Sequence, residues 1–456
     1  MLLESQVLKR ALFLSLLLFA ASGMLLNCGS SPSSTTSSGL KDRAFLSENV
    51  SAGATGAGVY IVNAQTDVRP IVAPISAGNA PGMMVITPNR NQTLVFSSQE
   101  NLLTAINNAS ESGSNHITLP GFTESLVVSP DSFTAYAAVP TAAVAGQSPG
   151  AVKVISLSSI AFTAELDIPS VRYLSIGNSG NRILAFSDNS NSVAVITPSN
   201  IGVGNAVTLL GGFDRPVAAF FSPDDSTAYV INCGAECGGA QASVQKIDLT
   251  QTTCLPFGVC PAVNVPAATV AILNGTTMYL AGTPYSSVGG TVTPTLLCNT
   301  GPTATQAKYC GQLSIFDLTN MSLVNPGTTI FLTDGYHNRM ALGANGQLFI
   351  GARTCAEITL PNPTSEVRGC LSIYNTLSAA VGSVPPAGVL IPSANGDVTG
   401  IQPIAKRNAV YVIQNGSLSI YDATTDALEN NPNDPNNPGQ IANLVGQFVD
   451  VKTVDF

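Results

Sequence analysis

The chain has 456 residues, of which 45% are apolar and only 10% are charged, and it contains 41 Gly and 29 Pro. Such a chain can bury a large core and has many turns, but it has few charges for the solvated surfaces of helices. The 18 basic and 27 acidic residues give a net charge of −9, which would repel a phosphate backbone and argues against nucleic acid as a partner.

The N-terminus has the pattern of an export signal. Lys9 and Arg10 precede the apolar run ALFLSLLLFAASGMLL, which suits a signal peptide better than a membrane span. The run ends in LLNCGSS, which resembles the lipobox of bacterial lipoproteins, with Leu25 at its first position and Cys28 as the lipidated residue. Asn27 departs from the small residue that this motif usually has before the cysteine.

This signal allows two forms of the mature protein. Lipidation would make residues 1–27 a signal peptide and residues 28–42 the lipidated Cys28 with a flexible Ser/Thr/Pro/Gly tether, anchored to a membrane of the cell envelope. The alternative is cleavage after the triplet Ala21-Ser22-Gly23, which would give a soluble secreted or periplasmic protein. We expect the lipoprotein, followed by a single domain at 43–456.

The cysteines favour an oxidised, exported protein. The chain has nine, and removing Cys28 leaves eight that fall into local couples. The predicted disulfides are Cys233–Cys237, Cys254–Cys260, Cys298–Cys310 and Cys355–Cys370. The alternative is a metal site formed by Cys233, Cys237, Cys254 and Cys260. Zinc sites prefer CxxC pairs, usually with His nearby, and neither occurs here, so we expect neither a metal nor a cofactor.

From Phe45 onward the sequence repeats four kinds of short apolar segment separated by turns. The second kind, as in SVQKIDLTQ, often ends in Asp or Asn, which cap turns. The third kind is variable, and the fourth, as in AAFFSPD, precedes the next aromatic segment. The first kind, counted eight times like the others, carries an aromatic residue at Phe45, Phe96, Tyr136, Phe186, Tyr229, Tyr279, Phe349 and Tyr411.

Repeats of four short strands joined by tight turns are typical of an all-β fold, the β-propeller, whereas a solenoid would have shorter repeats. The chain enters at the second strand of a repeat, at Phe45, and leaves with a first strand at Phe448 to Phe456. Pairing of these two ends would complete one antiparallel blade and remove the open edge of the ring. We therefore predict eight blades, or seven if the first repeat is only a decorated edge.

The pattern SPD…TAYV.N…SV..ID resembles the YVTN-type repeat of seven-bladed surface-layer and lactonase-like propellers. The resemblance extends from about residue 43 to the end and is clearest at 121–160 and 214–250. It implies a propeller and, through the lactonase-like members, hydrolysis of a lactone. It lies in the blade framework, so it assigns no catalytic residue. WD-type propellers match poorly because the chain has no Trp.

Long insertions are expected on one face of the ring. In an up-and-down blade, the turn from second to third strand and the passage to the next blade emerge on the same face. Residues 140–150, 233–242, 284–311 and 355–370 all join a second to a third strand, and three of the predicted disulfides lie there. Stiffened loops on a rigid scaffold are where recognition usually occurs, although they would also serve to shield blade edges.

The mouth of the central channel on that face should be lined where each innermost strand begins. Of the residues there, Glu124, Arg172, Arg215, Asn338 and Arg339 are candidate ligand-binding residues, and the charged ones would alternatively form a satisfied ion-pair plug. The aligned positions are Gly82, Glu124, Arg172, Val217, Ala268, Asn338 and Thr399, with Arg215, His337 and Arg339 beside them.

Two functions from different classes fit these features. The first, which we favour, is a monomeric binding or scaffold protein that recognises a protein or glycan through the stiffened loops. The second is a lactonase-like hydrolase or a lyase at the channel mouth, with His337 as general base and Glu124 and Arg339 as partners. No GxSxG elbow, HExxH helix or phosphate-binding Gly loop stands in strand–helix context.

Overall fold

The structure is a computed structural model, and it describes residues 37–49, 57–250, 261–288, 291–299, 308–324, 326–355, 371–377, 396–426, 428–429 and 446–455. The predicted signal peptide 1–27, Cys28 and the first part of the tether lie outside the described residues. All described strands belong to one compact unit, Ser38–Phe456. None of the described helices has the length and apolar character needed to cross a membrane.

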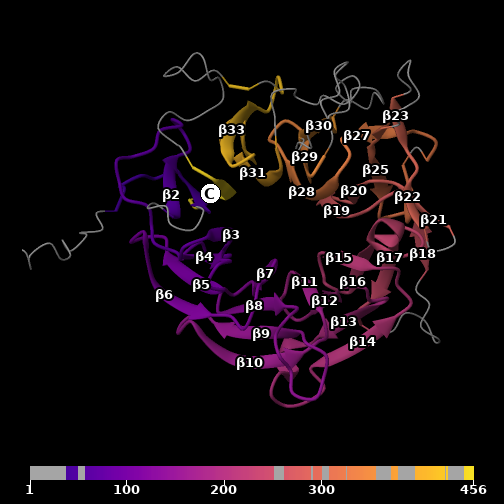
Figure 1. Ribbon diagram of the computed structural model, residues 1–456, viewed down its shortest axis with the longest axis horizontal. Helices are drawn as coiled ribbons and strands as arrows, with labels where there is room; N and C mark the ends of the chain where they lie inside the picture. Colours follow the sequence, from indigo (N-terminus) through magenta and orange to yellow (C-terminus); the bar gives the residue numbers. More distant parts are fainter. Residues whose placement is uncertain are drawn as a thin grey trace, which may run out of the picture. The chain divides into compact units, whose positions relative to one another are not determined.

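The strands form eight antiparallel blades arranged in a ring, so the prediction of an eight-bladed all-β propeller is confirmed. Figure 1 shows the innermost strands around the centre. Blades 2 to 5 each have four strands, given from the centre outward: β3 (Pro81–Ile86), β4 (Gln92–Ser97), β5 (Leu102–Asn107) and β6 (Ser112–Thr118); β7 (Ser125–Val128), β8 (Thr134–Val139), β9 (Ala151–Ser156) and β10 (Ala161–Asp167); β11 (Val171–Ile176), β12 (Ile183–Ser187), β13 (Ser192–Ile196) and β14 (Val207–Gly211); β15 (Pro216–Phe221), β16 (Thr227–Asn232), β17 (Ser243–Asp248) and β18 (Ala262–Asn264).

The described helical elements are two short 3₁₀ turns, η1 (Pro198–Asn200) and η2 (Gly234–Cys237). The strands of the other four blades are also given from the centre outward. The strands are β34 (Phe448–Thr453), β1 (Arg43–Glu48) and β2 (Gly58–Asn63) in blade 1; β19 (Val270–Asn274), β20 (Thr277–Gly282), β25 (Gly311–Asp317), β26 (Ser322–Leu323) and β27 (Ile330–Leu332) in blade 6; β28 (Tyr336–Leu342), β29 (Gln347–Arg353) and β30 (Leu371–Asn375) in blade 7; β31 (Val398–Ile404), β32 (Ala409–Gln414) and β33 (Ser417–Asp422) in blade 8; and the hairpins β21 (Tyr285–Val288) with β22 (Thr291–Pro294) and β23 (Leu297–Asn299) with β24 (Lys308–Tyr309).

The predicted aromatic residues lie on the second strand of every blade and fill the core between blades. Phe45, Phe186, Phe349 and Tyr411 are almost completely buried. Phe45 of blade 1, for example, belongs to one apolar cluster with Val95 of blade 2. Burial of a side chain of this kind contributes about 2–3 kcal/mol, so the repeated aromatic position holds each blade against its neighbour.

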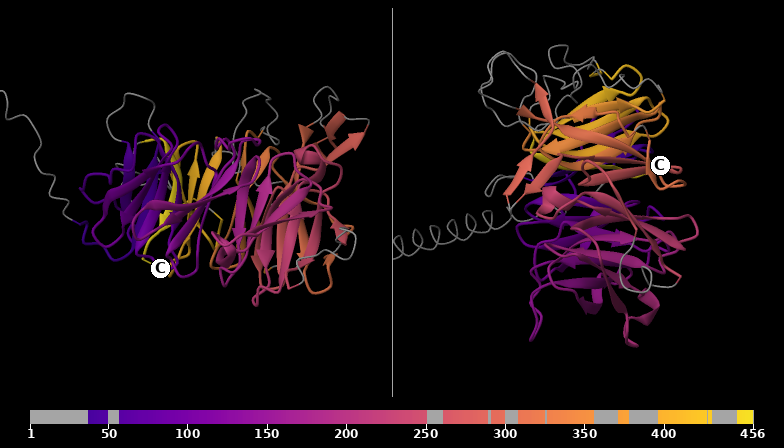
Figure 2. Two further views of the ribbon diagram at one scale, coloured as in Figure 1. Left: turned by 90° about the horizontal axis from the view of Figure 1, so that it is seen from below. Right: turned by 90° about the vertical axis from the view of Figure 1, so that its right-hand side faces the viewer.

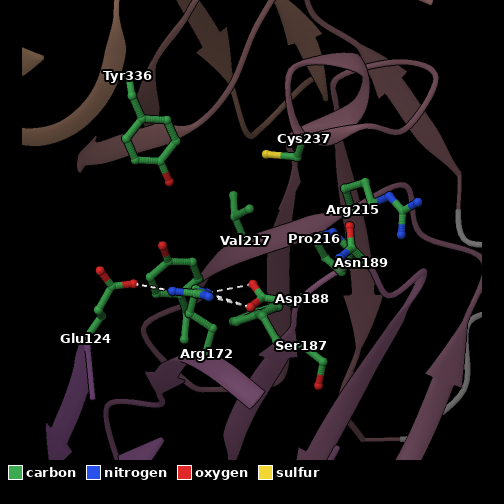
Figure 3. A pocket seen from close by; sticks show the side chains of 12 residues that line it. Glu124, Arg172, Ser187, Asp188, Asn189, Arg215, Pro216, Val217, Cys237 and Tyr336 are labelled. Atoms are coloured by element: carbon green, nitrogen blue, oxygen red, sulfur yellow. Dashed lines mark hydrogen bonds and ion pairs between the residues drawn. The ribbon is translucent and has the colours of Figure 1, made fainter. Parts of the chain in front are cut away.

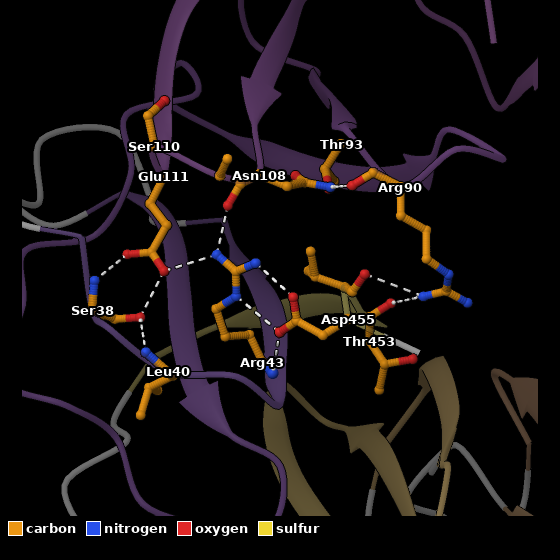
Figure 4. Close-up of polar contacts among 12 residues, drawn as sticks. Ser38, Leu40, Arg43, Arg90, Thr93, Asn108, Ser110, Glu111, Thr453 and Asp455 are labelled. Carbon is orange, nitrogen blue, oxygen red and sulfur yellow. Dashed lines mark hydrogen bonds and ion pairs between the residues drawn. The ribbon is translucent and has the colours of Figure 1, made fainter.

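The ring is closed by the two ends of the propeller unit, as predicted. Strands β1 and β34 pair antiparallel, with Leu46 opposite Val451. Arg43, which is almost fully buried, joins this seam to blade 2 (Figure 4). Its guanidinium donates hydrogen bonds to Asp455 near the C-terminus and to Glu111 and the Asn108 carbonyl of blade 2. The closure is therefore fixed by ion pairs as well as by strand pairing.

The strands run between the two faces of the ring (Figure 2). The predicted insertions 140–150, 233–242, 284–311 and 355–370 connect β8 to β9, β16 to β17, β20 to β25 and β29 to β30. Each connection joins the end of a second strand to the start of a third, and these strand ends all lie on the same face. We call this face the loop face and the opposite one the turn face.

Candidate ligand-binding site

Most of the innermost strands carry a β-bulge where they begin on the loop face, whereas β7 and β19 do not. The pairing of β11 with β12 skips Arg172, that of β15 with β16 skips Val217, and that of β28 with β29 skips Asn338. Thr399 in β31 and Val449 in β34 are skipped in the same way. A bulge leaves its residue outside the hydrogen-bond ladder and re-aims its side chain, which is why bulges concentrate at rims and near sites.

These bulges coincide with positions aligned from the sequence at the channel mouth. Arg172, Val217, Asn338 and Thr399 were all placed there from the repeat register. Val449 is the equivalent position in blade 1, and the alignment missed it because the last strand has no following repeat with which to compare it.

A pocket of about 500 Å³ opens at this mouth. Its lining comes from blades 3, 4, 5 and 7, which bring together residues far apart in sequence (Figure 3). Of the predicted site residues, Glu124, Arg172 and Arg215 line it, as does the aligned Val217. The remaining lining residues are Tyr173, Phe186, Ser187, Asp188, Asn189, Pro216, Cys237 and Tyr336.

Arg172 is held between two carboxylates on the wall of the pocket. Its Nε and Nη2 donate to Asp188, with the Nη2 to Oδ2 distance at 2.5 Å, and its Nη1 donates to Glu124 Oε2 at 2.6 Å. The hydrogen bonds to Asp188, and secondarily those to Glu124, raise the pKa of Arg172 above its ordinary value. All three side chains remain about one third exposed, so the cluster faces the pocket.

Two tyrosines and a second arginine complete the lining. Tyr336 is 39% exposed, and its hydroxyl points toward the cluster around Arg172 (Figure 3). Burial, and then the neighbouring Tyr336, raises the pKa of Tyr173, which stays a neutral phenol. Arg215 Nη2 donates to the Gly238 carbonyl at 3.4 Å, and among the described residues Arg215 forms no ion pair.

His337, Asn338 and Arg339 do not line this pocket. The bulge at Asn338 leaves Tyr336 at the mouth and turns His337 into the blade, where it is completely buried. Burial lowers the pKa of His337 to about 4. Arg339 instead spans blades 7 and 8, with its Nε donating to the Thr399 carbonyl at 2.9 Å.

The loop at 233–242 forms part of the pocket rim. Cys233 and Cys237 are disulfide-bonded around η2, and Cys237 lines the pocket. Cys310 and Cys355 are buried and also disulfide-bonded. The other three predicted pairs each include a side chain outside the described residues, so their pairing stays a prediction. No group of three or more His, Cys, Asp or Glu side chains that could hold a metal ion occurs in the described part of the chain.

Glu236, also in η2, was not singled out from the sequence. Burial raises its pKa to about 8, although the Thr283 backbone N–H donates to its Oε2 at 2.8 Å and partly offsets this. Thr283 in turn donates through Oγ1 to the Gly335 carbonyl at 3.1 Å. A protonated Glu236 therefore attaches the disulfide loop of blade 5 to blades 6 and 7.

Glu236 predicts a pH dependence of stability. The Glu236 carboxyl keeps its proton in the folded chain up to about pH 8, but loses it above pH 4.5 in the unfolded chain. The contribution of Glu236 to the free energy of unfolding is therefore complete below pH 4.5 and is lost as the pH rises to about 8. His337 acts in the opposite sense: its contribution is complete above pH 6.5 and is lost as pH falls to about 4. The free energy of unfolding should therefore fall by about 2 kcal/mol between pH 6.5 and 8.

Denaturant titrations of the wild type and Glu236→Gln across this range check that expectation. The amide keeps an uncharged hydrogen-bonding group at the site, so its stability should be nearly flat from pH 6.5 to 8. A wild-type curve that is flat as well, or a variant that keeps the same fall, would show that Glu236 does not hold the proton.

Comparisons with known proteins support the fold class. No family model matches the chain, and no curated protein sequence matches it. Among solved structures, it is similar to dihydro-heme d1 dehydrogenase NirN in complex with DHE, with 12% identity, a TM-score of 0.55, and coverage of 94% of this chain and 78% of that one. It is also similar to Kuenenia stuttgartiensis hydrazine synthase, with 13% identity, a TM-score of 0.51, and coverage of 76% and 96%. At these identities the similarity shows the fold alone: the chain is an eight-bladed β-propeller.

Proposed function

We propose that this propeller is an exported, membrane-anchored binding protein that holds a small polar ligand, or the polar end of a larger partner, at the mouth of its loop face. The observation that carries the proposal is the pocket of about 500 Å³ to which blades 3, 4, 5 and 7 contribute side chains. This volume is within the usual range of small-molecule sites. The bulged strands and the disulfide loop support the proposal, because they position the lining on a rigid frame.

Export and anchoring are proposed from the N-terminal sequence, and the YVTN-type, lactonase-like framework from the repeat. Lys9, Arg10 and the apolar run would direct export, and Cys28 in LLNCGSS would carry the lipid. Mass spectrometry of the mature protein is expected to find an N-terminal Cys28 bearing acyl chains, and Cys28→Ser should release the protein into the soluble fraction. A mature N-terminus at Met24 without lipid would instead support plain secretion.

The binding proposal is tested by filling the pocket. Val217 lies at the bulge of β15 and lines the pocket, so Val217→Trp should occupy part of its volume with little change to the blade. The matched control is Val68→Trp, since Val68 is 48% exposed and lies outside the pocket.

A metabolite library is then screened by thermal unfolding against all three proteins. A ligand at a hundredfold excess over its Kd stabilises a protein by about 2.7 kcal/mol. We expect at least one compound to raise the Tm of the wild type and of Val68→Trp but not of Val217→Trp. Equal responses of all three proteins, or no response of the wild type to any compound, would contradict binding at this mouth.

The hydrolase alternative has less support from the geometry. It needs a general base that reaches the substrate, and His337 is completely buried outside the pocket. Glu124 lies in the pocket but is paired with Arg172, while Arg339 lies between blades 7 and 8. A lactone screen of the wild type and His337→Ala would separate the two functions: binding predicts no turnover by either protein.

A further inference from the structure

The charges at the mouth of the loop face cancel. Two carboxylates, Glu124 and Asp188, and two guanidinium groups, Arg172 and Arg215, line the pocket. Three of the four are locked into one cluster by hydrogen bonds of 2.5–2.8 Å around Arg172. A polyanion would have to displace both carboxylates from Arg172, and a cation would meet this guanidinium beside them. Neither kind of charged ligand is favoured by this lining.

The cluster nevertheless presents polar atoms of both kinds. Arg172 has five N–H donors, and its hydrogen bonds to Asp188 and Glu124 leave two of them unused. Glu124 Oε1 accepts no hydrogen bond from a described residue. The Tyr336 hydroxyl, like any phenol, can both donate and accept. Donors and acceptors are therefore interspersed at fixed positions. A ligand whose groups each donate and accept, which is what a hydroxyl does, complements this arrangement best.

The pocket also offers an aromatic surface. Tyr336 stands at the mouth with 39% of its surface exposed, opposite the ion-pair cluster (Figure 3). Its ring lies on β28 with the hydroxyl end toward the cluster from blades 3 and 4, so a flat ligand on the exposed face of the ring would have the polar groups of the cluster beside its edge. The C–H face of a sugar ring packs on an aromatic ring, while its hydroxyls point outward toward polar partners.

We propose that the ligand of this pocket is an uncharged sugar ring, either a free saccharide or the end of a polysaccharide. The inference rests on the proposed binding function and adds the ligand class. Tyr336 would stack on the ring, and Arg172 with Glu124 would share the hydroxyls. Because no net charge is involved, binding should be nearly independent of salt, unlike the capture of an ion.

The test is calorimetric titration of the purified protein with glucose, galactose, mannose, N-acetylglucosamine and their disaccharides. Glucuronate, glycine, choline and inorganic phosphate are the charged comparators. A pull-down on cellulose and chitin beads separates a polymer end from a free sugar. We expect a neutral sugar to bind with a Kd that changes by less than about twofold between 50 and 500 mM NaCl. Val217→Trp should abolish that binding.

Variants of Tyr336 test the stacking. Tyr336→Ala should raise the Kd of the sugar by about tenfold or more. Tyr336→Phe keeps the aromatic ring, so its Kd should rise less. Phe331→Ala is the matched control, because Phe331 is equally exposed at 39% and does not line the pocket. If a charged comparator binds instead and Val217→Trp abolishes it, the sugar assignment is overturned while the binding function stands. If no neutral sugar binds, or Tyr336→Ala binds like the wild type, the assignment is overturned as well.

Discussion

Arg43→Met is expected to lower the free energy of unfolding by about 3–5 kcal/mol, since it removes the shared cation of a buried ion-pair network. The Arg43 side chain is 11% exposed, Glu111 5% and Asp455 20%. Arg43 donates to Asp455 Oδ1 at 2.6 Å and to Glu111 Oε1 at 2.9 Å, and hydrogen bonding to Asp455 is the main cause of its raised pKa. Met keeps most of the length of the side chain, so the main loss is charge compensation.

Urea denaturation measures this loss, with Arg182→Met as the matched control, because Arg182 lies outside the network and bonds the carbonyl of its neighbour Asn181. The control should change stability by less than about 0.5 kcal/mol. The triple variant Arg43→Met, Glu111→Gln, Asp455→Asn should recover part of the loss, because it also removes the stranded charges. A single variant as stable as the control would mean that strand pairing alone closes the ring.

Gly311→Ala is expected to destabilise the fold by about 2 kcal/mol or more. A Cβ at this position would lie 2.7 Å from His337 Nε2 and would overlap still more closely with the His337 ring carbon Cε1 and the Thr333 carbonyl oxygen. The Thr333 carbonyl also accepts a hydrogen bond from the Gly311 N–H at 3.0 Å, so the backbone there has little freedom to move away. The His337 ring therefore requires glycine at the first residue of β25.

Gly327→Ala provides the control for this change. Gly327 has nothing within 4 Å of the place of its Cβ, so alanine should be tolerated there. Combining Gly311→Ala with His337→Ala should remove the ring overlap but leave the overlap with the Thr333 carbonyl, so the pair should be less than additive. Equal Tm values for Gly311→Ala and Gly327→Ala would contradict the close packing around His337.

The blade framework was predictable because its determinants are local and repeated. The aromatic residue of the second strand recurs in every repeat and the turn residues in many of them, so the register of one blade predicts the next. The closing pair β1–β34 followed from the same count, since a chain that begins with a second strand must end with a first one. The number of blades was settled only by the structure, where the first repeat pairs as a full member of the ring.

The site was predictable only in part. Glu124, Arg172 and Val217, which occupy equivalent positions in the repeat, line the pocket, and so does Arg215 beside them. Asp188 was missed although it directly follows the aromatic strand ILAFS, because its role depends on the reach of Arg172 from the neighbouring strand. Tyr336 was missed because a bulge shifts the register by one residue, which puts the tyrosine at the mouth and His337 inside.

The central claim is that the mouth of the loop face holds the ligand, and a crystal structure of the protein with its best-binding neutral sugar tests it most directly. The account predicts electron density for one sugar ring on the exposed face of the Tyr336 ring, with sugar hydroxyls within hydrogen-bond distance of Arg172 and Glu124. Density for the sugar on the turn face or along an outer blade edge, with the mouth occupied only by solvent, would contradict it.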